Sequence, residues 1–128
     1  MAREPAGKRQ RKRAASWPWP DSLDALAAAP QYHRLVLENE RVRVLETRIP
    51  PGETAPLHTH RWGGVHFFVS FSDFVRRDEQ GRVLLDSRRT PLGLDFGGGF
   101  WVEPLEPHSV ENVGSAELRA VNFEIKKR

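Results

Sequence analysis

Short β-prone segments separated by turn signals fill the chain from Tyr32 to its C-terminus, and this feature most limits the fold. Residues 41–49 begin by alternating charged and apolar side chains, as a strand with one buried face does. Their phase changes at Val44-Leu45, which predicts a bulge. Residues 65–71 are strongly apolar, with β-branched and aromatic side chains, and predict a strand buried on both faces. About nine or ten such runs at close spacing predict an all-β sandwich or barrel.

The one helix that we expect precedes these β-prone segments. Residues 21–29 are rich in alanine, can be capped by Asp21 or Ser22, and end before Pro30. The preceding Trp-Pro-Trp-Pro at 17–20 cannot form regular structure, and it predicts an extended arm that packs its indoles on the domain or on a partner subunit. The chain therefore divides into a disordered basic tail (1–16), a Trp/Pro arm with a short helix (17–31) and a β-barrel domain (32–128).

The positive charge of the chain belongs to its N-terminus. The net charge is +3, but residues 1–13 contain six basic residues and one acidic residue, a net charge of +5. The remaining 14 basic and 16 acidic residues give −2. A solvated, disordered terminus is the simpler interpretation, and contact of the tail with nucleic acid or an anionic membrane is the alternative.

The composition excludes several classes of protein. The chain has no cysteine, so it cannot build a disulfide framework, a zinc ribbon or a thiol nucleophile, and a bound metal would need histidine or carboxylate ligands. No apolar run approaches the ~20 residues of a membrane span. No apolar segment follows the basic N-terminus, as it would in a secretory signal. We therefore expect a cytoplasmic protein without membrane partners.

Two histidines, His58 and His60, stand two positions apart shortly after the Pro-Pro-Gly turn at 50–52. Side chains at positions i and i+2 of a β-strand point to the same face, so both imidazoles would look into the same space. Converging neutral imidazoles are the beginning of a site for a first-row transition metal. This pair is the strongest indication of function in the chain.

Two spaced motifs, at 52–60 and 98–112, include these histidines and a third. The first has the pattern Gly, five residues, His-Thr-His; the second has Gly, five residues, Pro, three residues, His108, three residues, Asn. In this order they resemble the two motifs of cupins, although the second is one residue shorter between proline and histidine than is common there. The resemblance extends over residues 32–126 and is to small single-domain bacterial cupins, many of them uncharacterised.

The resemblance implies a double-stranded β-helix, the jelly-roll barrel of cupins. It also implies that His58, His60 and His108 lie inside the barrel and hold a divalent metal. Three imidazoles suit Fe, Mn, Ni, Cu or Zn and leave positions open for water or substrate.

The chain departs from the cupin pattern at the metal-binding carboxylate. The first motif has a glutamate four or five residues after its second histidine, where this chain has Gly64 and Val65. His66 follows, and one extra residue in the preceding loop would let it complete a four-histidine site. Alternatively, a shift of one residue turns His66 to the other face of its strand.

Other residues have weaker indications of a role. Phe100, Trp101 and Trp62 lie near the motif histidines and would form either an aromatic pocket wall or plain core. His33 has no motif context, so we expect a structural or surface residue. Asn112 is expected to satisfy backbone groups near a turn.

These observations predict a small metal-binding cupin, a metal-dependent oxygenase or isomerase acting on a small organic molecule. In that case Glu53 or a spare His66 would move protons. The alternative is a non-catalytic module that binds a ligand or metal as a sensor or accessory protein. The resemblance and the arm at 17–20 predict a homodimer.

Overall fold

The computed structural model describes residues 17–92 and 99–126. Within them a 3-10 turn, η1 (Asp21–Leu23), and a helix, α1 (Ala25–Ala28), precede the strands. The described strands are β1 (His33–Glu38), β2 (Val42–Ile49), β3 (Thr54–His60), β4 (Gly64–Ser70), β5 (Phe74–Arg77), β6 (Val83–Asp86), β7 (Gly99–Val102), β8 (Leu105–Asn112) and β9 (Leu118–Ile125).

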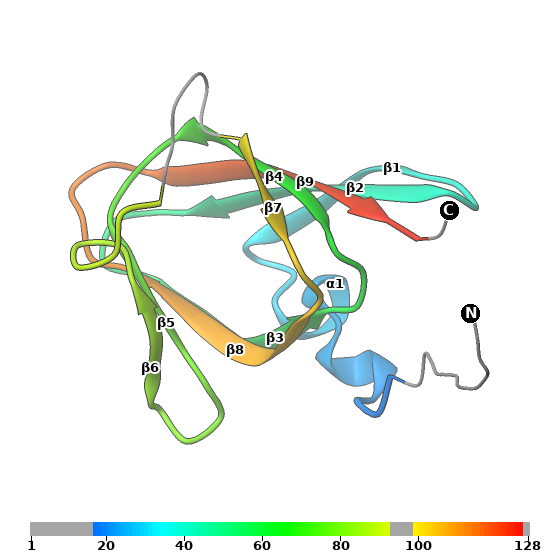
Figure 1. Ribbon diagram of the computed structural model, residues 1–128, viewed down its shortest axis with the longest axis horizontal. Coiled ribbons are helices and arrows are strands. Elements are labelled where there is room, and N and C mark those ends of the chain that lie inside the picture. Colours follow the sequence, from blue (N-terminus) through cyan, green and yellow to red (C-terminus); the bar gives the residue numbers. More distant parts are fainter. Residues whose placement is uncertain (1–16, 93–98, 127–128) are drawn as a thin grey trace, which may run out of the picture.

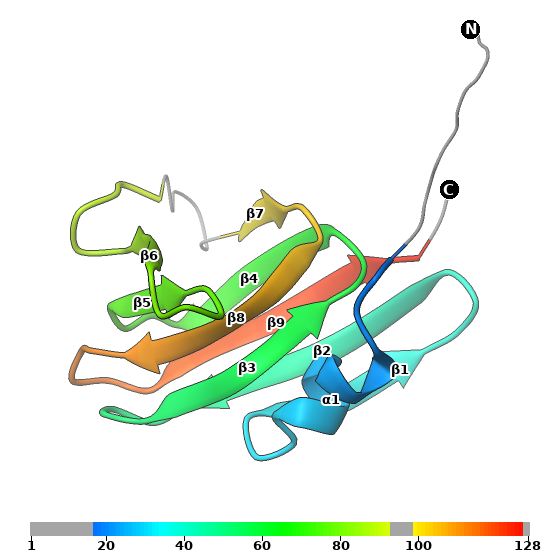
Figure 2. The same cartoon turned by 90° about the horizontal axis from the view of Figure 1, so that it is seen from below.

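The strands form two facing antiparallel sheets, as Figures 1 and 2 show. One sheet has the order β1-β2-β9-β4-β7, and the other has the order β3-β8-β5-β6. The helix α1 packs against β3 and β1 (Figure 2). The predicted all-β architecture is therefore confirmed, with the space between the sheets available for a core and a site.

The single helix predicted over 21–29 is wrong in its extent. The segment divides at Asp24, whose backbone is extended and whose carboxylate accepts a hydrogen bond from the Leu26 backbone N–H at 3.1 Å. Asp24 is therefore the cap of α1, in place of Asp21 or Ser22. The reason lies in tertiary structure, because the same carboxylate pairs with Arg43 on β2 at 2.8 Å.

The irregularity predicted at Val44-Leu45 belongs to the partner strand. β2 pairs with β9 without a break, whereas the register against β1 shifts between Leu35 and Leu37, directly opposite Leu45 and Val44. β2 therefore keeps a regular alternation, and Arg43 lies on the same interior face as Leu45.

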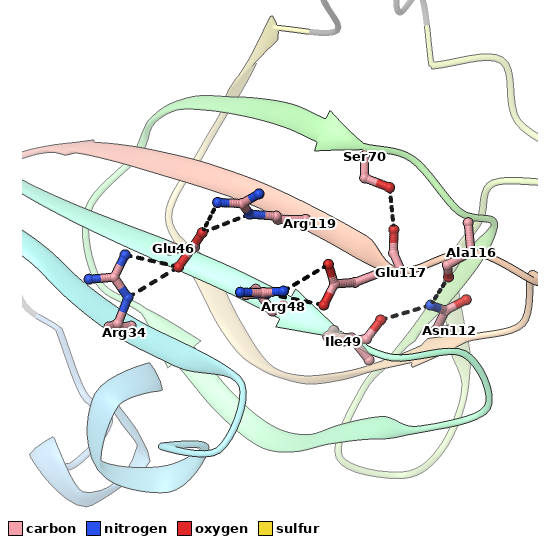
Figure 3. Close-up of polar contacts among 9 residues, drawn as sticks. All are labelled: Arg34, Glu46, Arg48, Ile49, Ser70, Asn112, Ala116, Glu117 and Arg119. Atoms are coloured by element: carbon pink, nitrogen blue, oxygen red, sulfur yellow. Dashed lines mark hydrogen bonds and ion pairs between the residues drawn. The ribbon is translucent and has the colours of Figure 1, made fainter.

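A polar network covers the outer face of β2 (Figure 3). Glu46 accepts hydrogen bonds from Arg119 at 2.7 Å and from Arg34 at 3.0 Å, and these guanidinium groups hold its pKa below the usual range. Arg48 pairs with Glu117 at 3.0 Å. These contacts join β1, β2 and the start of β9 on the face away from the other sheet.

The predicted role of Asn112 is confirmed. The Asn112 side-chain amide donates to the carbonyls of Ile49 and Ala116, both at 2.8 Å, so it satisfies backbone groups as expected (Figure 3). Gly81 has a φ of 82° in the turn between β5 and β6. This left-handed conformation favours glycine.

One buried apolar cluster between the sheets consists of Ile49, Ala55, Phe74 and Leu118, which come from both sheets. The described residues contain no helix long and apolar enough to span a membrane. The predicted tail at 1–16 and the glycine that opens the second motif, Gly98, lie outside the described residues.

Candidate metal centre

A small cavity between the two sheets contains every histidine of the chain in its walls. Its volume is about 60 Å³, and its imidazoles come from four strands. The histidines are His33 on β1, His58 and His60 on β3, His66 on β4 and His108 on β8. All five are buried, with exposed fractions between 1% and 9%.

The three histidines of the two motifs lie together. His58 and His108 are direct partners in the pairing of β3 with β8, and their ring centroids are 4.4 Å apart. The His60 ring lies 5.1 Å from His58 and 5.7 Å from His108. The alternation of β3 thus places both of its histidines on the interior face, as the i, i+2 spacing predicts.

His33 joins this group, which the sequence analysis did not anticipate. Its ring centroid lies 4.6 Å from His58 and 5.4 Å from His60. Potential ligand atoms of His33, His58 and His60 all lie within 4.8 Å of one another, the one such triad among the described residues. The surface position considered for His33 is therefore wrong. Its pairing opposite Thr47, which also lines the cavity, turns it inward, and no local pattern revealed that pairing.

His66 also faces the cavity. Its ring centroid lies 5.8 Å from His60 and 6.1 Å from Phe100, which lines the same wall. Two residues earlier, a Cβ atom on Gly64 would collide with the backbone carbonyl of Phe123 on β9. No glutamate fits at Gly64, so the carboxylate absent from the first motif is excluded there by the close approach of two strands.

The ring nitrogens of the histidines are oriented by hydrogen bonds. Nδ1 of His58 lies 2.6 Å from the Pro56 carbonyl oxygen, and Nδ1 of His108 lies 2.6 Å from that of Glu106. His33 makes the same kind of contact, at 3.1 Å, to a backbone carbonyl of the preceding segment. A carbonyl can only accept, so each Nδ1 carries the proton and each Nε2 keeps a free lone pair. This is the tautomer in which Nε2 binds a metal.

His60 is oriented by a carboxylate from the last strand. Its Nδ1 lies 2.6 Å from Glu124 Oε2, and Arg43 Nε donates to Glu124 Oε1 at 2.9 Å. Arg43 in turn donates to both carboxylate oxygens of Asp24, at 2.8 and 2.9 Å. The Glu124 side chain is fully buried. A continuous chain of polar groups therefore runs from the partly exposed cap of α1 through buried Arg43 and Glu124 to the cavity.

Burial keeps these imidazoles neutral. It lowers the pKa of His58, His66 and His108 to about 3 and that of His33 to about 4. It lowers the pKa of His60 as well. The contact between His60 and Glu124 is therefore a hydrogen bond from a neutral ring. Burial raises the pKa of Glu124 to about 7, although Arg43 opposes the rise.

Three residues considered for the cavity lie elsewhere. Trp101 is 57% exposed and donates its indole N–H to Glu103 at 2.6 Å. Trp62 stacks outside the cavity, where the Arg43 guanidinium lies 5.1 Å from its ring centroid. Glu53 accepts a hydrogen bond from the Tyr32 hydroxyl at 2.9 Å at an exposed position. Of the aromatic residues considered, Phe100 alone lines the cavity.

Apart from its histidines, the cavity has mostly apolar walls. Ile49, Phe74 and Leu118 of the core contribute to it, and Arg76 on β5 is the one described lining residue with a permanent charge. The described lining contains no aspartate or glutamate. Proton transfer inside the cavity would thus depend on an imidazole.

Comparison with solved structures identifies the same architecture in other proteins. A cupin domain from Bordetella pertussis Tohama I superimposes with a TM-score of 0.59 at 26% identity, covering 74% of this chain and 92% of that one. An RmlC-like cupin family protein with a double-stranded β-helix fold from Methanocaldococcus jannaschii has a TM-score of 0.51 at 16% identity, covering 73% and 77%. No family model matches the chain, and no curated protein matches it.

Proposed function

Because the chain is a small single-domain cupin with a double-stranded β-helix fold, we propose that its histidine cavity binds one divalent transition metal ion. One observation carries the proposal: imidazoles from several strands converge while protein acceptors hold their Nδ1 atoms. His58 and His108 use backbone carbonyls for this, and His60 uses Glu124. Such outer hydrogen bonds fix the tautomer and the ring orientation that metal-binding histidines need.

The donor set fits an ion of this class. Neutral imidazole suits Fe, Mn, Ni, Cu and Zn, whereas Mg²⁺ and Ca²⁺ require oxygen ligands that the described lining lacks. Burial already keeps the rings deprotonated at neutral pH, so an ion would displace few protons.

The resemblance to cupins and the spacing of potential ligand atoms both assign His58 and His60 as ligands. The third ligand has two candidates. Resemblance to cupins assigns His108, which lies directly opposite His58. The spacing of potential ligand atoms favours His33, the member of the compact triad. His66, whose ring centroid lies 5.8 Å from that of His60, is the fourth histidine of the proposed site.

We propose that the metal serves an oxygenase or isomerase reaction on a small organic molecule. A bound ion would supply Lewis acidity or redox chemistry at its open coordination positions. The chain would contribute a dry apolar wall and, through His66, one imidazole able to hold or move a proton. With no carboxylate in the described lining, reactions that need little proton transfer by the protein are favoured, which places an oxygenase ahead of an isomerase.

The same absence supports a second candidate, a non-catalytic module that binds a metal or small ligand. A site without a dedicated acid or base is sufficient for binding alone. Turnover distinguishes the candidates: an oxygenase consumes O₂ when a substrate is supplied, whereas a binding module retains its ligand unchanged.

Element analysis of untagged protein tests metal binding. We expect about one divalent ion per chain, and loss of that ion in His58→Ala and His60→Ala. Glu106→Gln, which changes an exposed carboxylate beside the site, is the matched control and should retain the metal. Of His33→Ala and His108→Ala, the variant that loses more metal identifies the third ligand. Wild-type protein with less than about 0.1 ion per chain, even after incubation with each metal, would contradict the proposal.

A further inference from the structure

Arg76 occupies an unusual position in the wall of the histidine cavity. It lies on β5, two residues after Phe74, so both side chains point to the interior face of the smaller sheet. Its direct cross-strand neighbours are Val110 on β8 and Leu85 on β6. Neither neighbour can accept a hydrogen bond from a guanidinium through its side chain, so the sheet itself offers Arg76 no structural partner.

One nitrogen of the guanidinium is correspondingly unsatisfied. Arg76 Nε is buried and has no hydrogen-bond partner, the one buried side-chain nitrogen or oxygen in this state among the described residues. No ion pair of Arg76 occurs within 17–92 and 99–126 either. A buried donor without an acceptor costs free energy, and such groups are rare in folded proteins.

Other arginines show how this chain normally accommodates a guanidinium. Arg43 is buried, and it is paired with Asp24 and Glu124. Arg77, the next residue after Arg76, pairs with Glu111 at 2.8 Å. Arg76 differs from both because it pairs with none of the described carboxylates, although Asp78, Glu79 and Glu106 line the adjoining surface groove. On its cavity side it faces imidazoles and mostly apolar side chains, so an acceptor there would have to come from outside the chain.

The positive charge of Arg76 lowers the pKa of nearby histidines. After burial itself, Arg76 contributes to lowering the pKa of His66, and it also contributes for His58 and His108. A cation placed near neutral imidazoles makes the cavity attractive to an anion.

We propose that Arg76 anchors the carboxylate of a small organic ligand inside the cavity, with the rest of the ligand directed at the histidines. The planar fork of a guanidinium matches a carboxylate in two parallel hydrogen bonds. The cavity of about 60 Å³ has room for on the order of four water-sized positions, which suits a ligand of a few non-hydrogen atoms. This inference rests on the proposed function in that it names the ligand class for the same cavity.

Arg76 also stands where such a ligand would enter. A surface groove of about 360 Å³ shares three wall residues with the cavity, namely Arg76, Leu105 and His108. Arg76 therefore contacts both the groove and the interior, and a carboxylate arriving through the groove would meet its guanidinium beside His108.

Titration with ¹³C-labelled acetate, followed by NMR at constant ionic strength, tests the inference on wild type and Arg76→Gln. Acetamide, which has nearly the same shape but no charge, and inorganic phosphate are the comparison probes. We expect acetate to bind wild type at least about 10-fold more tightly than either comparison probe. We expect Arg76→Gln to weaken acetate binding about 10- to 100-fold while its metal content equals that of wild type.

The outcomes separate this inference from metal binding. Equal acetate affinity in wild type and Arg76→Gln, in protein that holds metal, overturns the role of Arg76 and leaves the metal proposal standing. Arg76-dependent acetate binding in protein that takes up no metal supports Arg76 and contradicts the metal proposal. Tighter binding of phosphate than of acetate would overturn the assignment to carboxylates.

The stability of the ligand-free protein is a second test, because a structural role and a ligand-binding role of Arg76 predict opposite changes in its urea midpoint. Arg76→Met keeps an unbranched apolar side chain at this position and removes the unsatisfied donor, so the ligand-free variant should unfold at a higher urea concentration than wild type. A lower midpoint would show that Arg76 stabilises the fold, and it would overturn the inference that Arg76 is reserved for a ligand.

Discussion

Replacing Glu124 by glutamine should weaken both the fold and the metal site. The carboxylate accepts from two donors at once, Arg43 Nε at 2.9 Å and His60 Nδ1 at 2.6 Å, and it is fully buried. Glutamine has nearly the same shape but only one acceptor oxygen, so it can satisfy one of these donors. The remaining donor would be buried without a partner at a cost of about 1–3 kcal/mol, and the reduced pairing of Arg43 adds to this cost.

The variant can avoid that cost in one way, which harms the metal site instead. If His60 moves its proton to Nε2, Nδ1 can accept from the glutamine amide, but Nε2 then lacks the lone pair directed into the cavity. We therefore expect metal affinity to fall about 10- to 100-fold, as it does for lost outer-shell partners of metal ligands. Urea unfolding of metal-free protein and competition with a metal chelator measure the two effects separately.

Glu117→Gln is the matched control, because Glu117 pairs with Arg48 on the outer face and both side chains are partly exposed. Such a surface pair should be worth less than about 1 kcal/mol, and its loss should leave metal affinity unchanged. The reasoning would be refuted if Glu124→Gln were no less stable than Glu117→Gln and bound metal as tightly as wild type.

Three further predictions concern pH, packing and assembly. Burial lowers the pKa of His58, His66 and His108 from 6.5 to about 3, so the unfolded chain binds protons at a higher pH than the folded protein does. Metal-free protein should therefore lose stability as pH falls below about 6.5, by up to about 1.4 kcal/mol per pH unit for each histidine. A urea midpoint that is unchanged between pH 7.5 and 5 would contradict this. Gly64→Ala should destabilise the fold by more than about 2 kcal/mol, because its Cβ would meet a backbone carbonyl, whereas Gly99→Ala, with room for a Cβ, should have little effect on urea unfolding. We also expect a homodimer, since exposed Trp101 and its cross-strand neighbour Val65 present an apolar surface on the larger sheet; light scattering should give twice the mass of one chain, and a monomer would contradict it.

The architecture was accessible from sequence because turn signals and β-prone runs are local. The extent of the helix was not accessible, because the division at Asp24 depends on its pairing with Arg43, nineteen positions away in sequence. The alternation at 41–49 likewise suggested that its charged residues face solvent, yet Arg43 faces inward with Leu45. A buried arginine is acceptable here because carboxylates from two distant segments neutralise it, and no local pattern records that pairing.

The candidate site was predictable in part for the same reason. His58 and His60 share a face through local geometry alone, and His108 was indicated by the spacing of the second motif. His33 and Glu124 reach the site through pairings with β2, a relationship between strands far apart in the chain. The inward direction of His66 depended on its register against β9, where it lies opposite Asn122. A shift of one residue in this register would turn the His66 side chain outward, and the spacing of residues in the sequence does not specify the register.

Anomalous diffraction from crystals of metal-loaded protein, recorded at the absorption edge of the bound metal, tests the central claim most directly. We expect one strong peak within the cavity, about 2.0–2.2 Å from Nε2 of both His58 and His60, with a third imidazole from His33 or His108. Density at a surface site, or bonds from the metal to Nδ1 in place of Nε2, would contradict it.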